Sequence, residues 1–96
     1  MAVCRILQPE VTAEQYDKVR ERLAASNSMP PEGIKIHIAG PTEDGGWRVV
    51  EVWETREAAE RWGEKVMQAR QELGFTDGGP PKVTYLEVHN MMGPDA

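Results

Sequence analysis

GWRVVEVWET, residues 46 to 55, predicts a β-strand that runs directly into a helix. Valine and tryptophan favour strands, and Thr55 is a good N-cap residue for the helix that follows. Glu51 lies in the middle of this apolar strand, where a buried carboxylate is costly unless another group pairs with it. The first question that the sequence raises is therefore which groups surround Glu51.

The segments on either side of this strand form an alternating series of strands and helices. The expected strands are residues 2 to 8, 33 to 39, 47 to 54 and 82 to 89. Thr12 and Gln15 form a capping-box pattern at the start of one helix, which ends near Ser26. Thr55 caps the second helix, and Gly74 lies where a left-handed residue ends it.

The order strand, helix, strand, strand, helix, strand predicts an α+β fold. Two split βαβ units of this kind form a ferredoxin-like βαββαβ sandwich, in which a four-stranded antiparallel sheet carries both helices on one face. Residues 1 to 96 show no internal repeat or linker, so we expect a single domain. A domain of this size leaves a large fraction of its surface exposed, which favours association with a second copy.

Side chains of the expected strands alternate between two faces of the sheet. We expect the helices to cover the even-numbered face, which is largely apolar and contains Cys4, Ile6, Ile34, Ile36, Ile38, Val50, Val52, Leu86 and Val88. The odd-numbered face carries Trp47, Trp53 and Tyr85 together with charged residues, and soluble monomers rarely expose so large an apolar patch. The sequence therefore predicts a homodimer that packs sheet against sheet and encloses a cavity lined by odd-numbered side chains.

The register of the central hairpin decides which side chain lies next to Glu51. We assume a register with Ala39 opposite Trp47. Lys35 then lies opposite Glu51, where the two side chains can form a cross-strand ion pair. Arg5, on the neighbouring strand, is a second candidate partner. A structural ion pair in the wall of the dimer cavity is therefore one interpretation of Glu51.

Charge and composition narrow the classes of partner. The chain has a formal net charge of -5, with 16 acidic and 11 basic residues, which disfavours a nucleic-acid or anionic membrane surface. It has neither a leader-like start nor an apolar stretch long enough to cross a bilayer, so a cytoplasmic protein is expected. Cys4 is the only cysteine, which excludes an internal disulfide, and we expect it to be a small apolar residue of the first strand.

Two segments carry a resemblance to a known family. GWRVVEVWETREAAERW, residues 46 to 62, and the preceding HIAG, residues 37 to 40, resemble small antibiotic-biosynthesis-monooxygenase-like proteins. On these residues the chain is identified as a member of the dimeric α/β-barrel superfamily. The resemblance implies the fold and a dimer. It specifies function poorly, because the superfamily includes cofactor-free oxygenases, haem-degrading enzymes, isomerases, cyclases and proteins without known activity.

The functional interpretation makes Glu51 a general acid or base and His37 a proton relay. The expected substrate-binding residues are Trp47, Trp53, Tyr85, His89, Arg5 and Lys35. Such a set suits proton abstraction next to a carbonyl of a small aromatic or polyketide-like molecule, followed by isomerisation, cyclisation or reaction with oxygen. The alternative is a non-catalytic small-molecule binder or a structural dimer.

No metal and no cofactor are expected. The histidines and carboxylates of the strands lack the close spacing of a metal motif, and neither expected helix contains the histidine that ligates haem in the haem-degrading enzymes. The cofactor-free oxygenases of the superfamily place an asparagine beside a tryptophan in the cavity. This chain has only Asn27, in a loop, and Asn90, at the end of the last strand, which counts against oxygenase activity.

Overall fold

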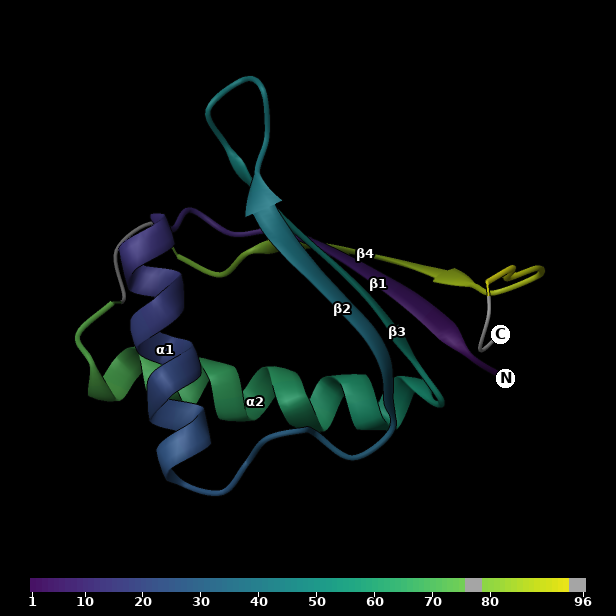
Figure 1. Cartoon of the computed structure of the whole chain (residues 1–96), viewed down its shortest axis with the longest axis horizontal. Coiled ribbons are helices and arrows are strands. Elements are labelled where there is room, and N and C mark those ends of the chain that lie inside the picture. The colour runs from purple at the N-terminus through teal and green to yellow at the C-terminus, as the bar shows by residue number, and fades with distance from the viewer. Residues whose placement is uncertain (76–78, 94–96) are drawn as a thin grey trace.

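The computed structural model describes residues 1–75 and 79–93, and its elements follow the predicted order. They are β1 (Val3–Gln8), α1 (Ala13–Ala25), β2 (Ile34–Pro41), β3 (Trp47–Trp53), α2 (Arg56–Glu72) and β4 (Lys82–Glu87) (Figure 1). The sheet has the order β2-β3-β1-β4, each neighbouring pair is antiparallel, and both helices lie on the same side of it. The predicted ferredoxin-like α+β fold is confirmed.

The helix boundaries follow local sequence signals. The Thr12 side chain accepts a hydrogen bond from the backbone N–H of Gln15, and the Gln15 side chain accepts one from the backbone N–H of Thr12, both at 3.1 Å. Thr55 caps α2 by accepting a hydrogen bond from the backbone N–H of Ala58. Gly74 follows α2 with a φ of +78°, in the left-handed region that glycine adopts without strain. The predicted caps are therefore confirmed.

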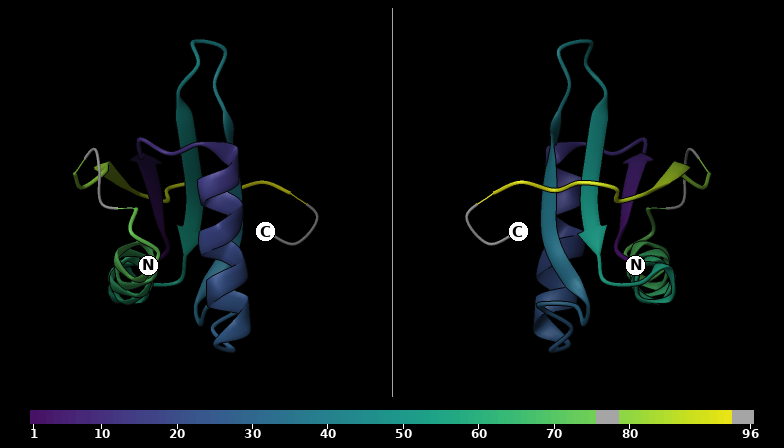
Figure 2. Two further views of the ribbon diagram at one scale, coloured as in Figure 1. Left: turned by 90° about the vertical axis from the view of Figure 1, so that its left-hand side faces the viewer. Right: turned by 90° about the vertical axis from the view of Figure 1, so that its right-hand side faces the viewer.

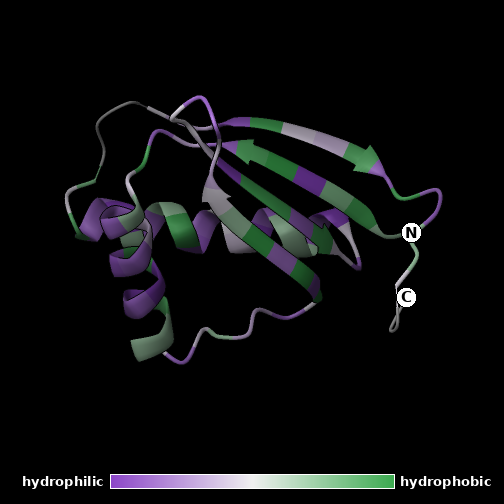
Figure 3. Cartoon of the chain, turned by 45° about the horizontal axis from the view of Figure 1, so that its top comes forward, coloured by the Kyte–Doolittle hydropathy of each residue, from purple (hydrophilic) through white to green (hydrophobic). Residues whose placement is uncertain are grey.

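The two faces of the sheet are reversed relative to the sequence-based expectation. The helices cover the odd-numbered side chains, so that Trp53 is fully buried and Glu51 is 2% exposed. The even-numbered side chains point away from the helices, and Ile38 and Leu86 are 56% and 47% exposed. Figure 3 shows the alternating hydrophobic and hydrophilic bands along the strands. The prediction that the helices cover the even-numbered face is wrong; we call the helix side the covered face and the other side the outer face.

Packing and pairing explain the reversal. Both faces carry large apolar side chains, so hydrophobic periodicity alone does not say which face meets the helices. The odd-numbered face supplies Trp53, which packs with Leu23 of α1 and Trp62 of α2 in the main core. Charged side chains on this face pair with one another, which offsets much of the cost of burying them. The covered face is therefore a core that contains charges.

The hairpin of β2 and β3 has a different register from the assumed one. His37 lies opposite Glu51, and Pro41 rather than Ala39 lies opposite Trp47. The difference arises because β2 runs on to Pro41, so part of the Gly- and Pro-rich segment that was expected to be turn is strand. The assumed register is wrong, and a histidine takes the place expected for a lysine.

An irregularity in β2 accounts for the position of Lys35. Ile34 lies opposite Trp53 and Ile36 lies opposite Val52, so the register shifts between the two isoleucines. Ile34 packs against the core, whereas Ile36 faces outward and is 46% exposed. Lys35 is exposed at this irregularity, and the expected ion pair between Lys35 and Glu51 is wrong.

The segment that follows β4 crosses the outer face. The backbone N–H of Val88 donates to the carbonyl of Ala2 at 3.0 Å, and the chain beyond it passes over β3 and β2 (Figure 2). Within the described ranges, neither helix is both long enough and apolar enough to cross a membrane. The outer face is thus partly overlaid by the C-terminal segment and otherwise open.

Candidate functional site

A row of polar side chains crosses the covered face, with one residue from each strand. His37 of β2 lies opposite Glu51 of β3, and Glu51 lies opposite Arg5 of β1. Arg5 in turn lies opposite Tyr85 of β4. Side chains that lie directly opposite on antiparallel strands are close neighbours, so the register alone brings these residues into line. We call His37, Glu51, Arg5 and Tyr85 the polar row.

Glu51 is the centre of the polar row, and both of its carboxylate oxygens have partners. The Nε1–H of Trp53 donates to Oε1 at 3.1 Å, and a guanidinium nitrogen of Arg5 lies 3.6 Å from the same oxygen. Nδ1 of His37 lies 2.7 Å from Oε2. The candidate pairing of Glu51 with Arg5 is confirmed. These partners explain how an apolar strand buries a carboxylate.

His37 connects this buried carboxylate with the surface. Its side chain is 35% exposed, and its Nε2 lies 2.6 Å from the hydroxyl of Tyr16 in α1. A carboxylate only accepts hydrogen bonds, so Nδ1 must carry the proton that His37 shares with Glu51. In the neutral imidazole Nε2 is then an acceptor, and the Tyr16 hydroxyl donates to it. We call the hydrogen-bonded series Tyr16, His37 and Glu51 the relay.

Tyr16 is the residue of this site that sequence reasoning missed. It falls at the apolar spacing of α1, which predicts a core residue, and only its hydroxyl distinguishes it from one. Partial burial raises the pKa of Tyr16, Arg20 opposes this shift, and the negative charge of Glu51 adds to it. The hydroxyl therefore stays protonated at neutral pH and remains a donor to His37.

Aromatic rings surround the exposed end of the relay. The ring centroids of Tyr16 and Trp47 are 5.3 Å apart, and those of Tyr16 and His37 are 6.1 Å apart. Nε1 of Trp47 is buried and has no hydrogen-bond partner among residues 1–75 and 79–93. The three rings thus lie next to one another at the relay, and aromatic rings of this kind suit contact with a flat aromatic molecule.

The other end of the polar row lies against α2. NH1 of Arg5 donates to the backbone carbonyl of Ala59 at 2.9 Å, and Arg5 is 8% exposed. The guanidinium of Arg56 lies 4.1 Å from the ring centroid of Tyr85, a distance that allows a cation–π interaction. Tyr85 remains partly exposed, so Arg56 covers this end only in part, whereas the end at His37 reaches Tyr16 of α1.

The predicted site residues fall into two groups. Arg5, His37, Glu51, Trp53 and Tyr85 come together on the covered face, and Trp47 joins them through Tyr16. Trp53 is fully buried in the core and has no surface left for a ligand. Lys35 and His89 lie elsewhere. The predicted cavity on the face away from the helices is therefore misplaced, and the predicted roles of these residues stay predictions.

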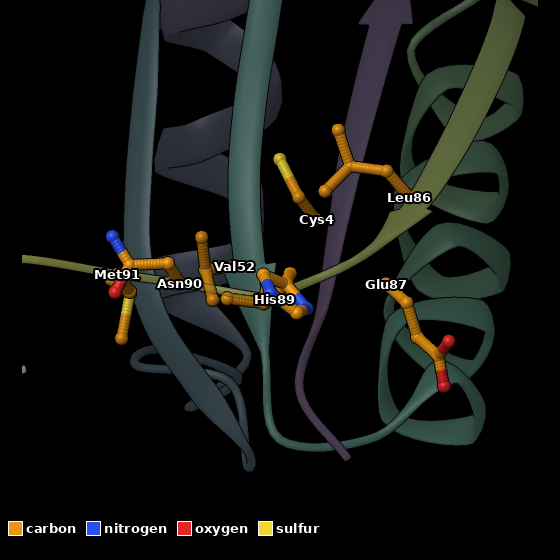
Figure 4. Close-up of a pocket in the computed structure, with 8 residues that line it drawn as sticks. Cys4, Val52, Leu86, Glu87, His89, Asn90 and Met91 are labelled. Atoms are coloured by element: carbon orange, nitrogen blue, oxygen red, sulfur yellow. The ribbon is translucent and has the colours of Figure 1, made fainter.

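Two surface hollows lie away from the relay. One, of about 450 Å³, lies on the outer face and is lined by Cys4, Val52, Leu86, Glu87, Val88, His89, Asn90 and Met91 (Figure 4). The other, of about 360 Å³, is lined by Arg22, Leu23, Ser26, Ser28, Lys65, Gln68, Ala69 and Glu72 of the two helices and the loop after α1. Burial raises the pKa of the Cys4 thiol, and the charge of Glu51 adds to this shift.

Within the described part of the chain, no group of three histidine, cysteine or acidic side chains is arranged to hold a metal ion.

This architecture is that of the antibiotic biosynthesis monooxygenase-like proteins, so the resemblance is confirmed for the fold. Rv0793 from Mycobacterium tuberculosis matches with a TM-score of 0.65 and 18% identity, over 97% of this chain and 100% of that chain. A proposed antibiotic biosynthesis monooxygenase from Deinococcus radiodurans matches with a TM-score of 0.58 and 21% identity, over 97% of this chain and 100% of that chain. A mutant of SnoaB, a cofactor-independent oxygenase from Streptomyces nogalater, matches with a TM-score of 0.57 and 12% identity, over 95% of this chain and 94% of that chain. No protein-family model and no curated protein matches the chain, and fold similarity alone does not define an activity.

Proposed function

We propose that the protein is a cytoplasmic homodimer that binds a small planar molecule at the exposed end of the relay and removes a proton from it. One observation carries this proposal. Hydrogen bonds of 2.6 Å and 2.7 Å join Tyr16, a partly exposed His37 and a buried Glu51 without interruption. Such a series gives the histidine one tautomer and gives a proton a path away from the ligand.

His37 is the base in this reaction, and Tyr16 passes the proton to it. A ligand with an acidic C–H or O–H group meets the Tyr16 oxygen. As the proton of the ligand moves to this oxygen, the hydroxyl proton of Tyr16 moves to Nε2 of His37. The resulting imidazolium lies 2.7 Å from Oε2 of Glu51, whose negative charge stabilises it.

Glu51 acts through His37 rather than on the ligand. Its Oε1 is occupied by Trp53 and Arg5, and its Oε2 is occupied by His37. A ligand therefore has no free carboxylate oxygen to approach. This assignment differs from the sequence-based prediction, in which Glu51 itself was the general acid or base.

Reaction of the deprotonated ligand with O2 is the reaction class that we propose. Oxidation of an activated methylene to a carbonyl consumes one O2 and releases one water, so the balance requires no external reductant. The fold similarity to SnoaB, a cofactor-independent oxygenase, supports this class. Return of the proton to a different carbon of the same anion gives an isomerisation instead.

The outer face supports the homodimer. Its large apolar side chains include Ile36, Ile38 and Leu86, which are 46%, 56% and 47% exposed. A two-fold dimer covers the same patch on both copies at once, and soluble monomers rarely leave such a patch open. In this dimer the relay lies on the opposite side of the sheet from the interface, so the partner stabilises the sheet without lining the site.

A non-catalytic binder or a structural dimer is the second candidate function. It is favoured by the full occupation of the Glu51 oxygens and by the two hollows, neither of which includes a residue of the relay. In that case the relay ties α1 to the sheet and has no chemical role.

The decisive experiment uses anthrone, an aromatic ketone with an activated methylene. We expect the wild-type protein to accelerate deuterium exchange of this methylene in D2O without oxygen, and to accelerate O2 uptake in air. His37→Gln should lower both rates by about 10²- to 10⁴-fold, the usual contribution of a general base. His89→Gln changes the other histidine, which lines the outer-face hollow, and should leave both rates unchanged.

Two results would contradict proton transfer. Equal rates for the wild type and His37→Gln would remove His37 from the reaction. Quenching of tryptophan fluorescence by anthrone without any deuterium exchange would identify a binder without catalysis, which is the second candidate.

A further inference from the structure

Gly63 is an unusual residue at its position, because it lies in the middle of α2. Glycine is among the least favourable residues in a helix interior, since it has the most conformational freedom to lose. Gly63 also needs no left-handed φ, because it is absent from the positive-φ glycines of the described chain. The reason for a glycine here must therefore be space and not backbone conformation.

Arg5 occupies the space that a side chain at Gly63 would need. A Cβ atom built on Gly63 would lie 2.8 Å from NH2 of Arg5, and 3.4 Å from both Cζ and NH1. NH1 of Arg5 donates to the carbonyl of Ala59, one turn earlier in α2, at 2.9 Å. The guanidinium thus lies against α2 at the one position in this stretch that has no side chain.

The same guanidinium sets the orientation of the Glu51 carboxylate. Arg5 and Trp53 both approach Oε1, at 3.6 Å and 3.1 Å, whereas His37 approaches Oε2 at 2.7 Å. With Oε1 held from two sides, Oε2 is directed at Nδ1 of His37. Nε of Arg5 is buried and has no partner among the described residues, so Arg5 is held by this packing and by few hydrogen bonds.

We propose that Arg5 is a positioning residue for His37, and that Gly63 provides the gap in which Arg5 acts. The gap places the guanidinium between Ala59 and Glu51, Glu51 then presents Oε2, and Oε2 fixes the tautomer of His37. The catalytic consequence rests on the proposed function. The positioning itself does not, because the tautomer of a histidine is measurable without turnover.

The test combines Gly63→Ala with Arg5→Lys. Alanine is the better helix residue, so Gly63→Ala by itself is expected to raise Tm by roughly 4 to 8 °C in a domain of this size if nothing opposes the new methyl group. We expect no such gain in the wild-type background, because the methyl group displaces the guanidinium. In the Arg5→Lys background the bulky guanidinium is gone, and Gly63→Ala should show the gain. Non-additivity of this kind is the sign of two residues that share one space.

The second readout is the His37 ring, observed by ¹⁵N NMR at a pH where it is neutral. The wild type should show the tautomer with the proton on Nδ1, and both Gly63→Ala and Arg5→Lys should shift His37 toward a mixture of tautomers. His89 is the control in the same spectrum and should not change. Arg5→Lys keeps a positive charge and adds no bulk, so it serves as the second test if Gly63→Ala fails to fold.

Additive Tm changes would overturn the proposed packing of Arg5 against Gly63. Non-additive Tm changes with an unaltered His37 tautomer would overturn the positioning role, because the contact would then be structural only. A tautomer shift in a protein that never reacts with anthrone would support the positioning and contradict the proposed function, so the two failures are distinguishable.

Discussion

The covered face and the outer face of the sheet both depart from a simple pattern of apolar inside and polar outside. The covered face buries Arg5 and Glu51, which are 8% and 2% exposed, whereas the outer face leaves Ile38 56% exposed. Burial of the charges is tolerated because they lie opposite each other in register and have further hydrogen-bond partners. Pairing, and not polarity alone, therefore decides which face of this sheet is buried.

The two faces also suit different tasks. The covered face contains a series of polar groups that reaches from the core to the surface at Tyr16, which is the arrangement that proton transfer requires. The outer face offers apolar area with few polar groups, which is the arrangement that association requires. The following predictions separate these tasks by changing one face at a time.

Glu51→Gln should have the largest effect, and it acts on the covered face. The amide keeps the shape of the carboxylate but leaves Arg5 buried without a counter-charge. Removal of one partner of a buried pair costs roughly 3 to 5 kcal/mol of unfolding free energy, a large share of the stability of a small domain. Urea unfolding at one fixed protein concentration measures this loss.

Glu54→Gln is the matched control, because Glu54 is an exposed glutamate just beyond β3. We expect a change within about 0.5 kcal/mol for this surface substitution. If both variants lost the same free energy, the covered face would not depend on its buried charges.

Ile38→Lys should have an intermediate effect, and it acts on the outer face. The side chain is 56% exposed, so covering it in a dimer contributes about half of the free energy of burying a fully exposed isoleucine. A two-fold interface contains this residue from both copies, so the contribution is doubled. The expected loss of roughly 1.5 to 3 kcal/mol raises the dimer dissociation constant about 10- to 100-fold. Sedimentation equilibrium measures this constant.

Gln71→Lys adds the same single positive charge on the exposed side of α2 and should leave the dimer dissociation constant unchanged. A wild-type protein that is monomeric at every concentration tested, or an Ile38→Lys variant that associates as tightly as the wild type, would show that the outer face is not the interface.

Tyr16→Phe should have the smallest effect, and it shortens the relay by one hydroxyl. Loss of the hydrogen bond to His37 is expected to cost about 0.5 to 1.5 kcal/mol. Because the pKa of Tyr16 is raised in the folded protein, the unfolded chain ionises first as the pH rises through about 10, the ordinary value for tyrosine. Stability therefore falls with pH above that value in the wild type.

Tyr16→Phe should remove this part of the alkaline loss, which urea midpoints at pH 8 and pH 10.5 would reveal. If Tyr16→Phe lost as much stability between pH 8 and pH 10.5 as the wild type, burial would not protect the Tyr16 hydroxyl from ionisation.

Much of the fold could be predicted from local patterns. The capping box at Thr12 and Gln15, the cap at Thr55 and the left-handed Gly74 mark helix boundaries through interactions within a few residues. The order of elements followed from these signals and from strand alternation. Part of the site could be predicted too, because a carboxylate in an apolar strand signals a partner, and Arg5 was a candidate for it.

Three features of the site could not be predicted from local patterns. The pairing of His37 with Glu51 depends on how far β2 continues before its turn and on the irregularity at Lys35. Tyr16 reaches His37 only because α1 packs beside β2, and its hydroxyl gives no signal in a pattern of apolar spacing. The gap at Gly63 matters only because the side chain of Arg5 fills it, and Arg5 lies far away in the sequence.

The α+β class, the order of the elements and the presence of two apolar sheet faces could be predicted from the sequence, since each depends on residue type and short-range periodicity. The face that the helices cover and the side chains that surround Glu51 became evident only in the folded chain. The physical reason is that a strand alternates equally well with either face inward. Which face is buried depends on the packing of Trp53 with the helices and on the pairing of the buried charges. These contacts form only when all the elements are in place.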